Sequence, residues 1–212
     1  MEKNLSHEIK TIIFDLGGVY FTDGAKRAIS EISSKYNLQE EDVKKVLKGE
    51  LGTQYRIGKI TVDQFWNEAK KIWNKPEIES DDLSQIWLEG YTPIEGTVIL
   101  VRQLEKSGYK LFFLSDNVKE RVEYLEDKYD FLKYFRGGVF SHIVKTRKPD
   151  PVIYKKAIEV AGDIPEQCVY IDDKEDLLVP AREIGMKTVH FKSPDQVRVD
   201  LEALGVLISE KI

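Results

Sequence analysis

The chain has 212 residues, of which 32 are Lys or Arg and 37 are Asp or Glu, so its formal charge is −5. This length predicts one domain, or one domain with a sizeable insertion, and the 42% hydrophobic content excludes a disordered chain. The sequence has no block of basic residues, which excludes nucleic acid as the main partner because proteins that neutralise phosphates carry a basic face.

The chain contains one cysteine, Cys168, which lies in an apolar run and is predicted to be a buried core residue rather than a nucleophile. A single cysteine excludes an intramolecular disulfide and is typical of a reducing compartment. The first ten residues are polar, and no apolar run approaches the roughly 18 residues needed to span a bilayer. We therefore expect a soluble cytoplasmic protein without a membrane partner.

Residues 9–14 form a β-branched and aromatic run that stops at Asp15. Such a run predicts a buried strand. The glycines at 17 and 18 then permit a tight turn. A carboxylate at the carboxyl end of a central strand lies where α/β folds place their functional sites.

Residues 24–90 show the period of amphipathic helices rather than of strands. Apolar positions predict helices around residues 28–36, 43–47, 61–73 and 80–87, and Thr61 with Gln64 forms a capping box at the start of the third. All three tryptophans lie in this stretch. We expect them in the core of a small helical bundle; a ligand-stacking tryptophan is the alternative.

After residue 93 strands and helices alternate. Strands are predicted at 110–114, 138–140, 169–171 and 187–191. Helices are predicted at 96–106, between the strands at 110–114 and 138–140, after Pro149, and after the strand at 169–171 as far as Gly185. This alternation predicts an α/β fold with a doubly wound parallel sheet. The predicted layout is a core domain of residues 1–20 and 93–212, with an all-helical cap of residues 21–92 inserted into it.

Polar groups follow several of the predicted strands: Asp15, Ser115, Lys148 and the pair Asp172 and Asp173. Parallel strands bring such groups to one edge of the sheet, where they can support phosphoryl transfer. Asp15 and Asp173 can bind a hard cation such as Mg²⁺. The Asp15 carboxylate can attack phosphorus to give an aspartyl-phosphate. Ser115 and nearby backbone N–H groups can bind phosphoryl oxygens, whose charge Lys148 neutralises.

Four segments occur in a characteristic order: Phe14-Asp15-Leu16-Gly17-Gly18-Val19, Leu114-Ser115, Arg147-Lys148-Pro149-Asp150 and Tyr170-Ile171-Asp172-Asp173. They resemble, in that order, the four motifs of the haloacid dehalogenase-like (HAD) hydrolase superfamily, and the helical insertion resembles the C1 cap of its subfamily IA. The resemblance covers residues 9–192. It implies a Mg²⁺-dependent phosphatase acting on a small phosphorylated metabolite, such as a sugar phosphate, and it leaves the oligomeric state, monomer or homodimer, open.

The resemblance also implies roles for individual residues. Asp15 would be the nucleophile and a Mg²⁺ ligand, and Gly17 would bind the ion through its carbonyl oxygen. Asp173 would be the main acidic ligand of the last motif, with Asp172 supporting it directly or through water. The phosphoryl group would be bound by residues at the second and third motifs: Ser115, Asp116, Asn117 and Lys148.

Gly17 is a departure from the family pattern. Most phosphatases of the superfamily carry an Asp at this position, which protonates the leaving group and then activates water. Such a general acid contributes about 10²–10⁴-fold. Some members with a Phe-Asp-Leu-Gly first motif nevertheless resemble working sugar-phosphate phosphatases. One interpretation is a phosphatase for substrates whose leaving groups need little protonation, such as anomeric, acyl and aryl phosphates.

A second interpretation is that another group supplies the proton. Asp116, directly after Ser115, is the main candidate, although we expect it to cap the following helix. His142 is a weaker candidate and is expected to be solvated.

Two further functions are open. A catalytically impaired binding module is disfavoured by the presence together of Asp15, Lys148 and the two acids of the last motif. A haloacid dehalogenase also lacks an acid at position 17, but it needs no cation, so Asp172 and Asp173 favour the phosphatase.

The cap is expected to determine substrate specificity by closing over the site. Its candidate contacts are Tyr55, Arg56 and Trp66, the first two from a segment that resembles a loop-and-helix element of such caps. For Arg56, a solvated surface position is the alternative.

Overall fold

The computed structural model describes residues 8–209. The first seven and the last three residues, which the predicted core segments include, lie outside the described residues. Among residues 8–209, no helix combines the length and the apolar character needed to cross a membrane.

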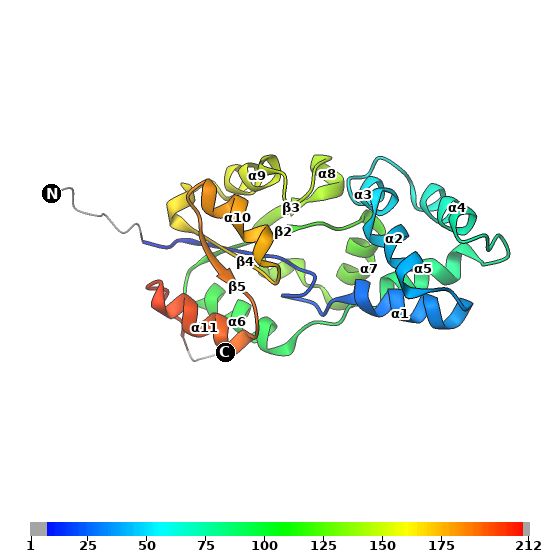
Figure 1. Cartoon of the computed structure of the whole chain (residues 1–212). Helices are drawn as coiled ribbons and strands as arrows, with labels where there is room; N and C mark the ends of the chain where they lie inside the picture. The colour runs from blue at the N-terminus through cyan, green and yellow to red at the C-terminus, as the bar shows by residue number, and fades with distance from the viewer. Residues whose placement is uncertain (1–7, 210–212) are drawn as a thin grey trace.

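A five-stranded, fully parallel sheet forms the centre of the core (Figure 1), with strand order β3-β2-β1-β4-β5. The strands are β1 (Thr11–Phe14), β2 (Lys110–Ser115), β3 (Gly137–Phe140), β4 (Cys168–Asp172) and β5 (Lys187–His190). Strand β1 pairs with both β2 and β4, so the strand order reverses there. The predicted doubly wound α/β sheet is confirmed, and β1 marks its switch point, where such sheets place their sites.

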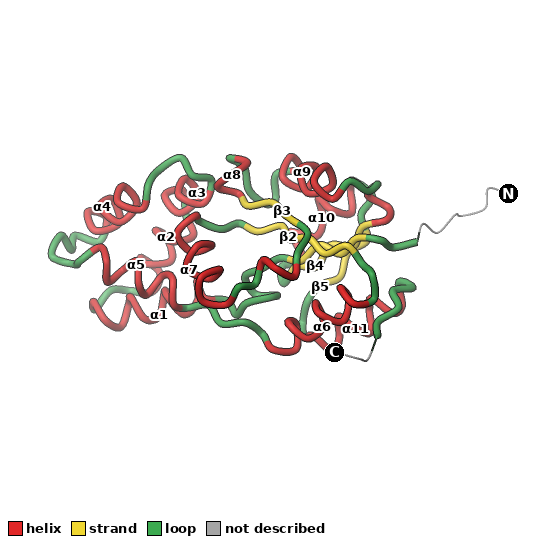
Figure 2. Tube along the Cα trace, turned by 180° about the vertical axis from the view of Figure 1, so that it is seen from behind, coloured by secondary structure: helices red, strands yellow, loops and turns green. Residues whose placement is uncertain are grey.

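Two helical layers cover the sheet, because alternate residues of each strand point to opposite faces. Ile12 and Phe14 pack with the pair α6 (Glu95–Lys106) and α11 (Pro194–Ala203), whereas Ile13 packs with α9 (Pro151–Ala161) and α10 (Glu175–Glu183). Figures 1 and 2 show these pairs on the two sides of the sheet. The buried Cys168 belongs to the second layer, as predicted.

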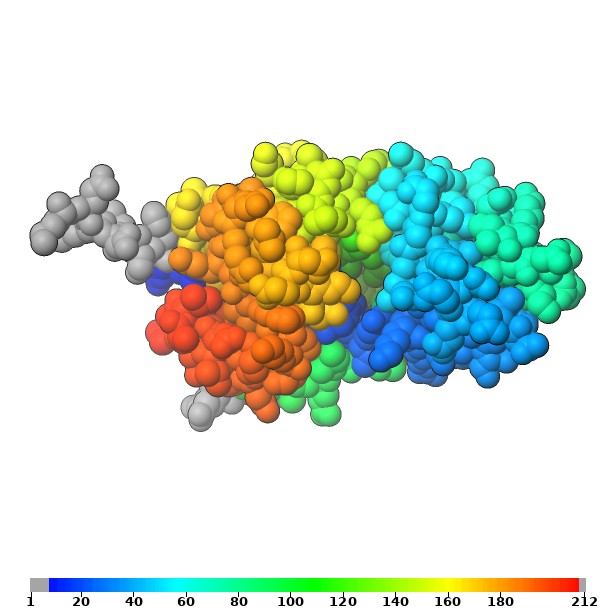
Figure 3. All heavy atoms as spheres, in the orientation of Figure 1, coloured from blue at the N-terminus to red at the C-terminus, as the bar shows by residue number. Residues whose placement is uncertain are grey.

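Five helices form a separate helical unit beside the core (Figure 3): α1 (Gly24–Tyr36), α2 (Glu40–Lys48), α3 (Glu50–Arg56), α4 (Val62–Ile72) and α5 (Ser80–Glu89). They share a hydrophobic core of their own that includes all three tryptophans, so the core interpretation of these residues is correct. The chain enters and leaves the unit side by side, where Thr22 N–H donates to the carbonyl oxygen of Thr92 at 2.9 Å.

Helix α7 (Lys119–Tyr129) follows β2 and contacts α5 of the helical unit. Three short helices complete the core: η1 (Leu132–Tyr134), α8 (Ser141–Val144) and η2 (Pro165–Gln167).

Local signals explain several boundaries, including two that the sequence reading missed. The capping box of Thr61 and Gln64 starts α4, as predicted. Helix α11 was not predicted, although Ser193 and Gln196 form the same kind of box at its start. Helix α3 was not predicted either; Gly49 ends α2 and lies directly before α3.

Candidate active site

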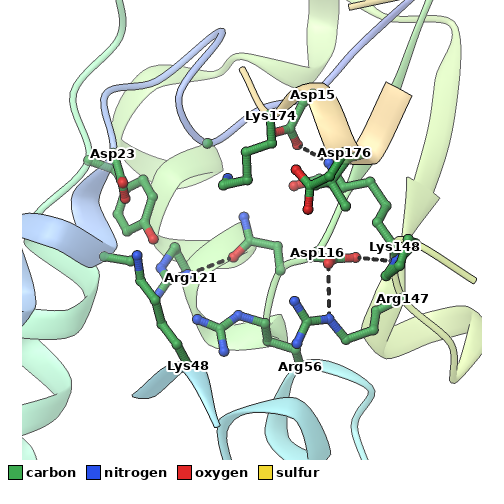
Figure 4. Close-up of a pocket in the computed structure, with 17 residues that line it drawn as sticks. Asp15, Asp23, Lys48, Arg56, Asp116, Arg121, Arg147, Lys148, Lys174 and Asp176 are labelled. Carbon is green, nitrogen blue, oxygen red and sulfur yellow. Dashed lines mark hydrogen bonds and ion pairs between the residues drawn. The ribbon is translucent and has the colours of Figure 1, made fainter. Parts of the chain in front are cut away.

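The parallel register brings the predicted polar groups to one edge of the sheet. Phe14 is paired with Phe113 of β2 and with Ile171 of β4, so Asp15 lies between the carboxyl ends of those two strands. A cavity of about 300 Å³ lies there. Figure 4 shows its lining, which comes both from these strand ends and from the helical unit.

Three carboxylates cluster at this edge. Asp15, Asp172 and Asp173 each offer an oxygen atom, and these atoms all lie within 4.8 Å of one another. A set of carboxylate oxygens matches the ligands that Mg²⁺ prefers. Burial raises the pKa of Asp15, and the Lys148 ammonium offsets part of this shift. The donor set therefore fits a hard divalent cation.

Lys148 links two of these acids. Its Nζ lies 2.9 Å from Asp15 Oδ1 and 2.7 Å from Asp172 Oδ2, and it donates to the Tyr170 hydroxyl oxygen at 2.9 Å. Burial alone lowers the pKa of Lys148, but the charges of Asp15 and Asp172 outweigh it and raise that pKa above its ordinary value. Lys148 is therefore a permanent cation in contact with Asp15.

The two acids of the last motif differ in burial and in the number of donors that already contact them. Asp172 is fully buried; Lys148 Nζ and the Tyr170 hydroxyl donate to its Oδ2, and Lys174 N–H donates to its Oδ1 at 2.9 Å. Asp173 is only partly buried, and Lys174 Nζ lies 3.2 Å from its Oδ1. Asp173 is thus the more available of the two for an incoming ligand.

Asp116 does not cap the following helix, so that prediction was wrong. Helix α7 begins at Lys119 and its N-cap is Val118, which has no polar side chain. The Asp116 carboxylate instead accepts hydrogen bonds from Arg147 Nε and from the backbone N–H of Lys148, both at 3.1 Å. It connects the end of β2 to the segment that carries Lys148.

Ser115 and Asn117 flank Asp116 and both line the cavity. Ser115 is 2% exposed. Asn117 accepts from Arg121 Nη1 through its Oδ1 at 3.2 Å. The residues predicted to bind phosphate at the end of β2, Ser115 to Asn117, thus lie at the same cavity as the acid cluster.

His142 is not solvated, contrary to expectation. It is half-buried, its Nδ1 lies 2.8 Å from the carbonyl oxygen of Asn117, and its ring stacks on Phe140. His142 is not among the described residues that line the cavity.

The glycine turn after Asp15 lies against the acid cluster. Gly18 has a φ of +96°, and a Cβ at this position would come within 2.6 Å of Asp173 Oδ2. Only glycine suits this close approach. Gly17 differs, since a Cβ there would meet only Tyr91 Cε1, at an ordinary 3.6 Å. The position of the missing acid therefore has room for a side chain.

Of the three candidate contacts in the helical unit, only Arg56 lines the cavity. Arg56 lines the cavity and is only 8% exposed, so the solvated alternative is wrong. Tyr55 is buried beside the lining; its hydroxyl donates to a Glu120 carboxylate oxygen at 2.9 Å and its ring stacks on Phe65. Trp66 is fully buried in the helical core.

Several lining residues were given no role from the sequence. They are Asp23, Lys48, Tyr91, Arg121, Arg147, Lys174 and Asp176. Arg147 belongs to the third motif, and Lys174 and Asp176 lie within three residues of the fourth, so this proximity was an available signal. Arg121 and Tyr91 carry no such signal, because nothing in the local pattern places them opposite Asp15.

Comparisons with known proteins agree with this geometry. A family model described as haloacid dehalogenase-like hydrolase matches residues 9–185. A HAD family enzyme from Bacteroides thetaiotaomicron, solved in complex with magnesium and inorganic phosphate, superposes with a TM-score of 0.73 at 26% identity, over 87% of this chain and 94% of that one.

Two relatives are named as a phosphatase and as a hydrolase of a nucleotide. A phosphoglycolate phosphatase from Aquifex aeolicus is 25% identical over 85% of this chain and 83% of its own length. A flavin mononucleotide hydrolase from Arabidopsis thaliana is 28% identical over 63% of this chain, which spans 54% of that protein.

Proposed function

The chain belongs to the haloacid dehalogenase-like hydrolase family, and we propose that it is a Mg²⁺-dependent phosphatase that hydrolyses a small phosphorylated metabolite through an aspartyl-phosphate at Asp15. The family predicted from the four motifs is confirmed by the match over residues 9–185, and the predicted fold by the solved relatives. The observation that carries the proposal is the position of Asp15, which forms an ion pair with a buried lysine and has carboxylate oxygens of two further acids within 4.8 Å.

In the proposed first step, an Asp15 oxygen attacks phosphorus while the bond from phosphorus to the leaving oxygen breaks. Lys148, which lies 2.9 Å from Asp15 Oδ1, orients this carboxylate and neutralises charge on the phosphoryl oxygens. Ser115 and neighbouring backbone N–H groups bind the phosphoryl oxygens. Water then hydrolyses the aspartyl-phosphate and regenerates Asp15.

The proposed metal ligands are Asp15, Asp172, Asp173 and the Gly17 carbonyl oxygen. When bound there, Mg²⁺ would neutralise phosphate charge that otherwise repels a carboxylate nucleophile. Because Asp172 already accepts from three donors, we assign direct coordination chiefly to Asp15 and Asp173.

The leaving group determines which substrates we expect to react fastest. Gly17 supplies no acid, and both Asp116 oxygens accept hydrogen bonds from the Arg147–Lys148 segment. This arrangement supports substrates whose leaving group needs little protonation, such as anomeric sugar phosphates, acyl phosphates and aryl phosphates.

We propose that residues 21–92 act as the cap over a core of residues 1–20 and 93–212. The cavity is lined from both parts, and its volume of about 300 Å³ lies at the small end of ligand pockets, which suits a metabolite. The single buried thiol supports a reducing compartment, and the cytoplasm is the proposed location.

The test is release of phosphate from 4-nitrophenyl phosphate and from anomeric, acyl and alkyl phosphates, with Mg²⁺ and then with excess chelator. We expect Mg²⁺-dependent turnover that Asp15→Asn abolishes. Halide release from a 2-haloacid that survives the chelator would instead support a dehalogenase. Ligand binding without turnover would support a binding module.

A further inference from the structure

The charges of the cavity are unevenly distributed between its two ends. Figure 4 shows Asp15 and Lys174 at one end and Lys48, Arg56 and Arg121 towards the other. At the Asp15 end each cation has a carboxylate partner: Lys148 contacts Asp15 and Asp172, and Lys174 contacts Asp173. The opposite end carries an excess of positive charge.

Arg121 is fixed in place by neutral groups. It is 1% exposed, and its guanidinium carbon lies 3.9 Å from the centre of the Trp87 ring and 4.3 Å from that of Tyr91. Its Nη atoms donate to Asn117 Oδ1 and to the Trp87 carbonyl oxygen. Within residues 8–209, its buried Nε has no hydrogen-bond partner and no carboxylate forms an ion pair with it.

Arg56 repeats this arrangement from the helical unit. Its Nη1 donates to the carbonyl oxygens of Leu47 and Gly52 at 2.7 and 3.1 Å, and its guanidinium carbon lies 5.3 Å from the same Trp87 ring. In the described part of the chain, its hydrogen bonds also go to neutral groups alone. The side chain lines the cavity.

The two guanidinium groups therefore share one indole ring, and within residues 8–209 neither forms an ion pair with a carboxylate. Burial, followed by the charge of Arg121, lowers the pKa of Arg56 to about 10, and burial likewise lowers the pKa of Arg121. Asp23, a lining carboxylate whose charge acts on Arg121, forms no ion pair with it and accepts the backbone N–H of Lys26 as the N-cap of α1. Buried cations without an ion-pair partner are costly, so an anion entering this end would be stabilised.

We propose that Lys48, Arg56 and Arg121 form a second anion-binding site, and that the substrate is a phosphomonoester whose alcohol part carries a second anionic group, either a carboxylate or a phosphate. This inference rests on the proposed function only for what happens at the Asp15 end. A neutral alcohol would leave both buried arginines without an anionic partner.

The test compares substrates with and without an anionic group at the far end. Gluconate 6-phosphate against glucose 6-phosphate tests a carboxylate, and glucose 1,6-bisphosphate against glucose 1-phosphate tests a phosphate. We expect kcat/KM to favour the doubly anionic member of at least one pair by about tenfold or more, since charge-assisted hydrogen bonds are the strong ones. The pair that shows the preference identifies the anion. Equal kcat/KM values within both pairs would overturn the inference.

Variants identify the residues responsible. Arg121→Gln keeps a side-chain amide but removes the charge, and should reduce the preference about tenfold. Lys48→Gln should also reduce the preference. Because Lys48 is exposed, this substitution should not disturb the fold. The matched control is Lys187→Gln, which removes one exposed charge from the amino end of β5, far from the strand ends that carry the site, and should leave the preference unchanged. A preference that persists in both cavity variants would contradict the assignment.

Binding measured without turnover separates the two proposals. Calorimetry on the Asp15→Asn protein should give a dissociation constant about tenfold lower for glucose 1,6-bisphosphate or gluconate 6-phosphate than for its partner. If the wild type hydrolyses 4-nitrophenyl phosphate but shows neither preference, the inference fails and the phosphatase stands. If nothing is hydrolysed but the calorimetric preference is present, the phosphatase fails and the anion site stands.

Discussion

The carboxylate of Asp116 accepts the backbone N–H of Lys148 at 3.1 Å, across 32 positions of sequence. This bond, together with the ion pair to Arg147, fixes the segment from which Lys148 reaches Asp15. Asp116 is thus a positioning residue in the proposed reaction.

A pair of substitutions at Asp116 distinguishes positioning from proton donation. Asp116→Asn keeps an acceptor for Lys148 N–H and should lower kcat less than tenfold, whereas Asp116→Ala removes the acceptor and should lower it further. Loss of a general acid would cost about 10²–10⁴-fold in either variant. Turnover of 4-nitrophenyl phosphate and of an alkyl phosphate measures both. An equal, large loss in the two variants, confined to the alkyl phosphate, would show that Asp116 donates the proton.

Gly17→Asp should create the acid that the turn lacks. A Cβ at position 17 meets only Tyr91 Cε1 at 3.6 Å, so the side chain can be accommodated. We expect kcat/KM for alkyl phosphates to rise by about tenfold or more, with a smaller change for aryl phosphates, whose leaving groups need less protonation. Gly17→Asn is the control of equal size. Equal rates for the two variants would mean that proton transfer does not limit the reaction.

Removal of the metal should abolish phosphatase activity, and added Mg²⁺ should restore it. Asp173→Asn should raise the Mg²⁺ concentration for half-maximal activity by about tenfold or more, because Asp173 is the more available acid of its motif. A Mg²⁺ titration of the initial rate measures this shift. Glu175→Gln, at an exposed neighbouring position, is the control. An unchanged Mg²⁺ requirement in Asp173→Asn would contradict the ligand assignment.

Asp163 should stabilise the fold in a pH-dependent manner. Burial raises its pKa, but hydrogen bonds from Thr11 Oγ1 at 2.6 Å and from Lys110 Nζ outweigh burial and lower it below the ordinary value. A lowered folded-state pKa contributes stability above the unfolded-state pKa, and this contribution is lost as the pH falls through the folded-state value.

Asp163→Asn should therefore lower the free energy of unfolding by about 1 kcal/mol at pH 7, with a difference that shrinks below about pH 4. Urea unfolding at several pH values measures it. Asp127→Asn, at an exposed position on α7, should show neither effect. A difference that does not change with pH would exclude an ionised Asp163 as its source.

The sequence alone predicted the strands that carry the acids and the helical insertion, because those depend on local hydrophobic period. Side-chain pairing over long range was not predictable in this way. Asp116 has the residue type and spacing of a helix cap, yet its partners come from a segment some thirty residues later. Arg56 is charged and was equally compatible with solvent, yet carbonyl oxygens of α2 and α3 and the Trp87 ring bury it.

Arg121 illustrates the same limit at the candidate site. Its helix was predicted, but its burial depends on Trp87 and Tyr91, which come from α5 and the segment just after it, some thirty residues earlier in the chain. The motifs identified the end of the cavity where the chemistry is proposed. The opposite end became visible only when segments far apart in sequence were placed together.

The central position of β1 has a consequence for how the chain matures. This strand is made first, yet one of its two neighbours is β4, so Asp15 and Asp172 meet only after most of the chain exists. A nascent or truncated chain that ends before residue 168 lacks two of the three acids of the cluster, Asp172 and Asp173. Pairings between such distant segments form slowly. Recovery of activity during refolding should therefore coincide with the pairing of β4 with β1, the step that brings Asp172 to Asp15.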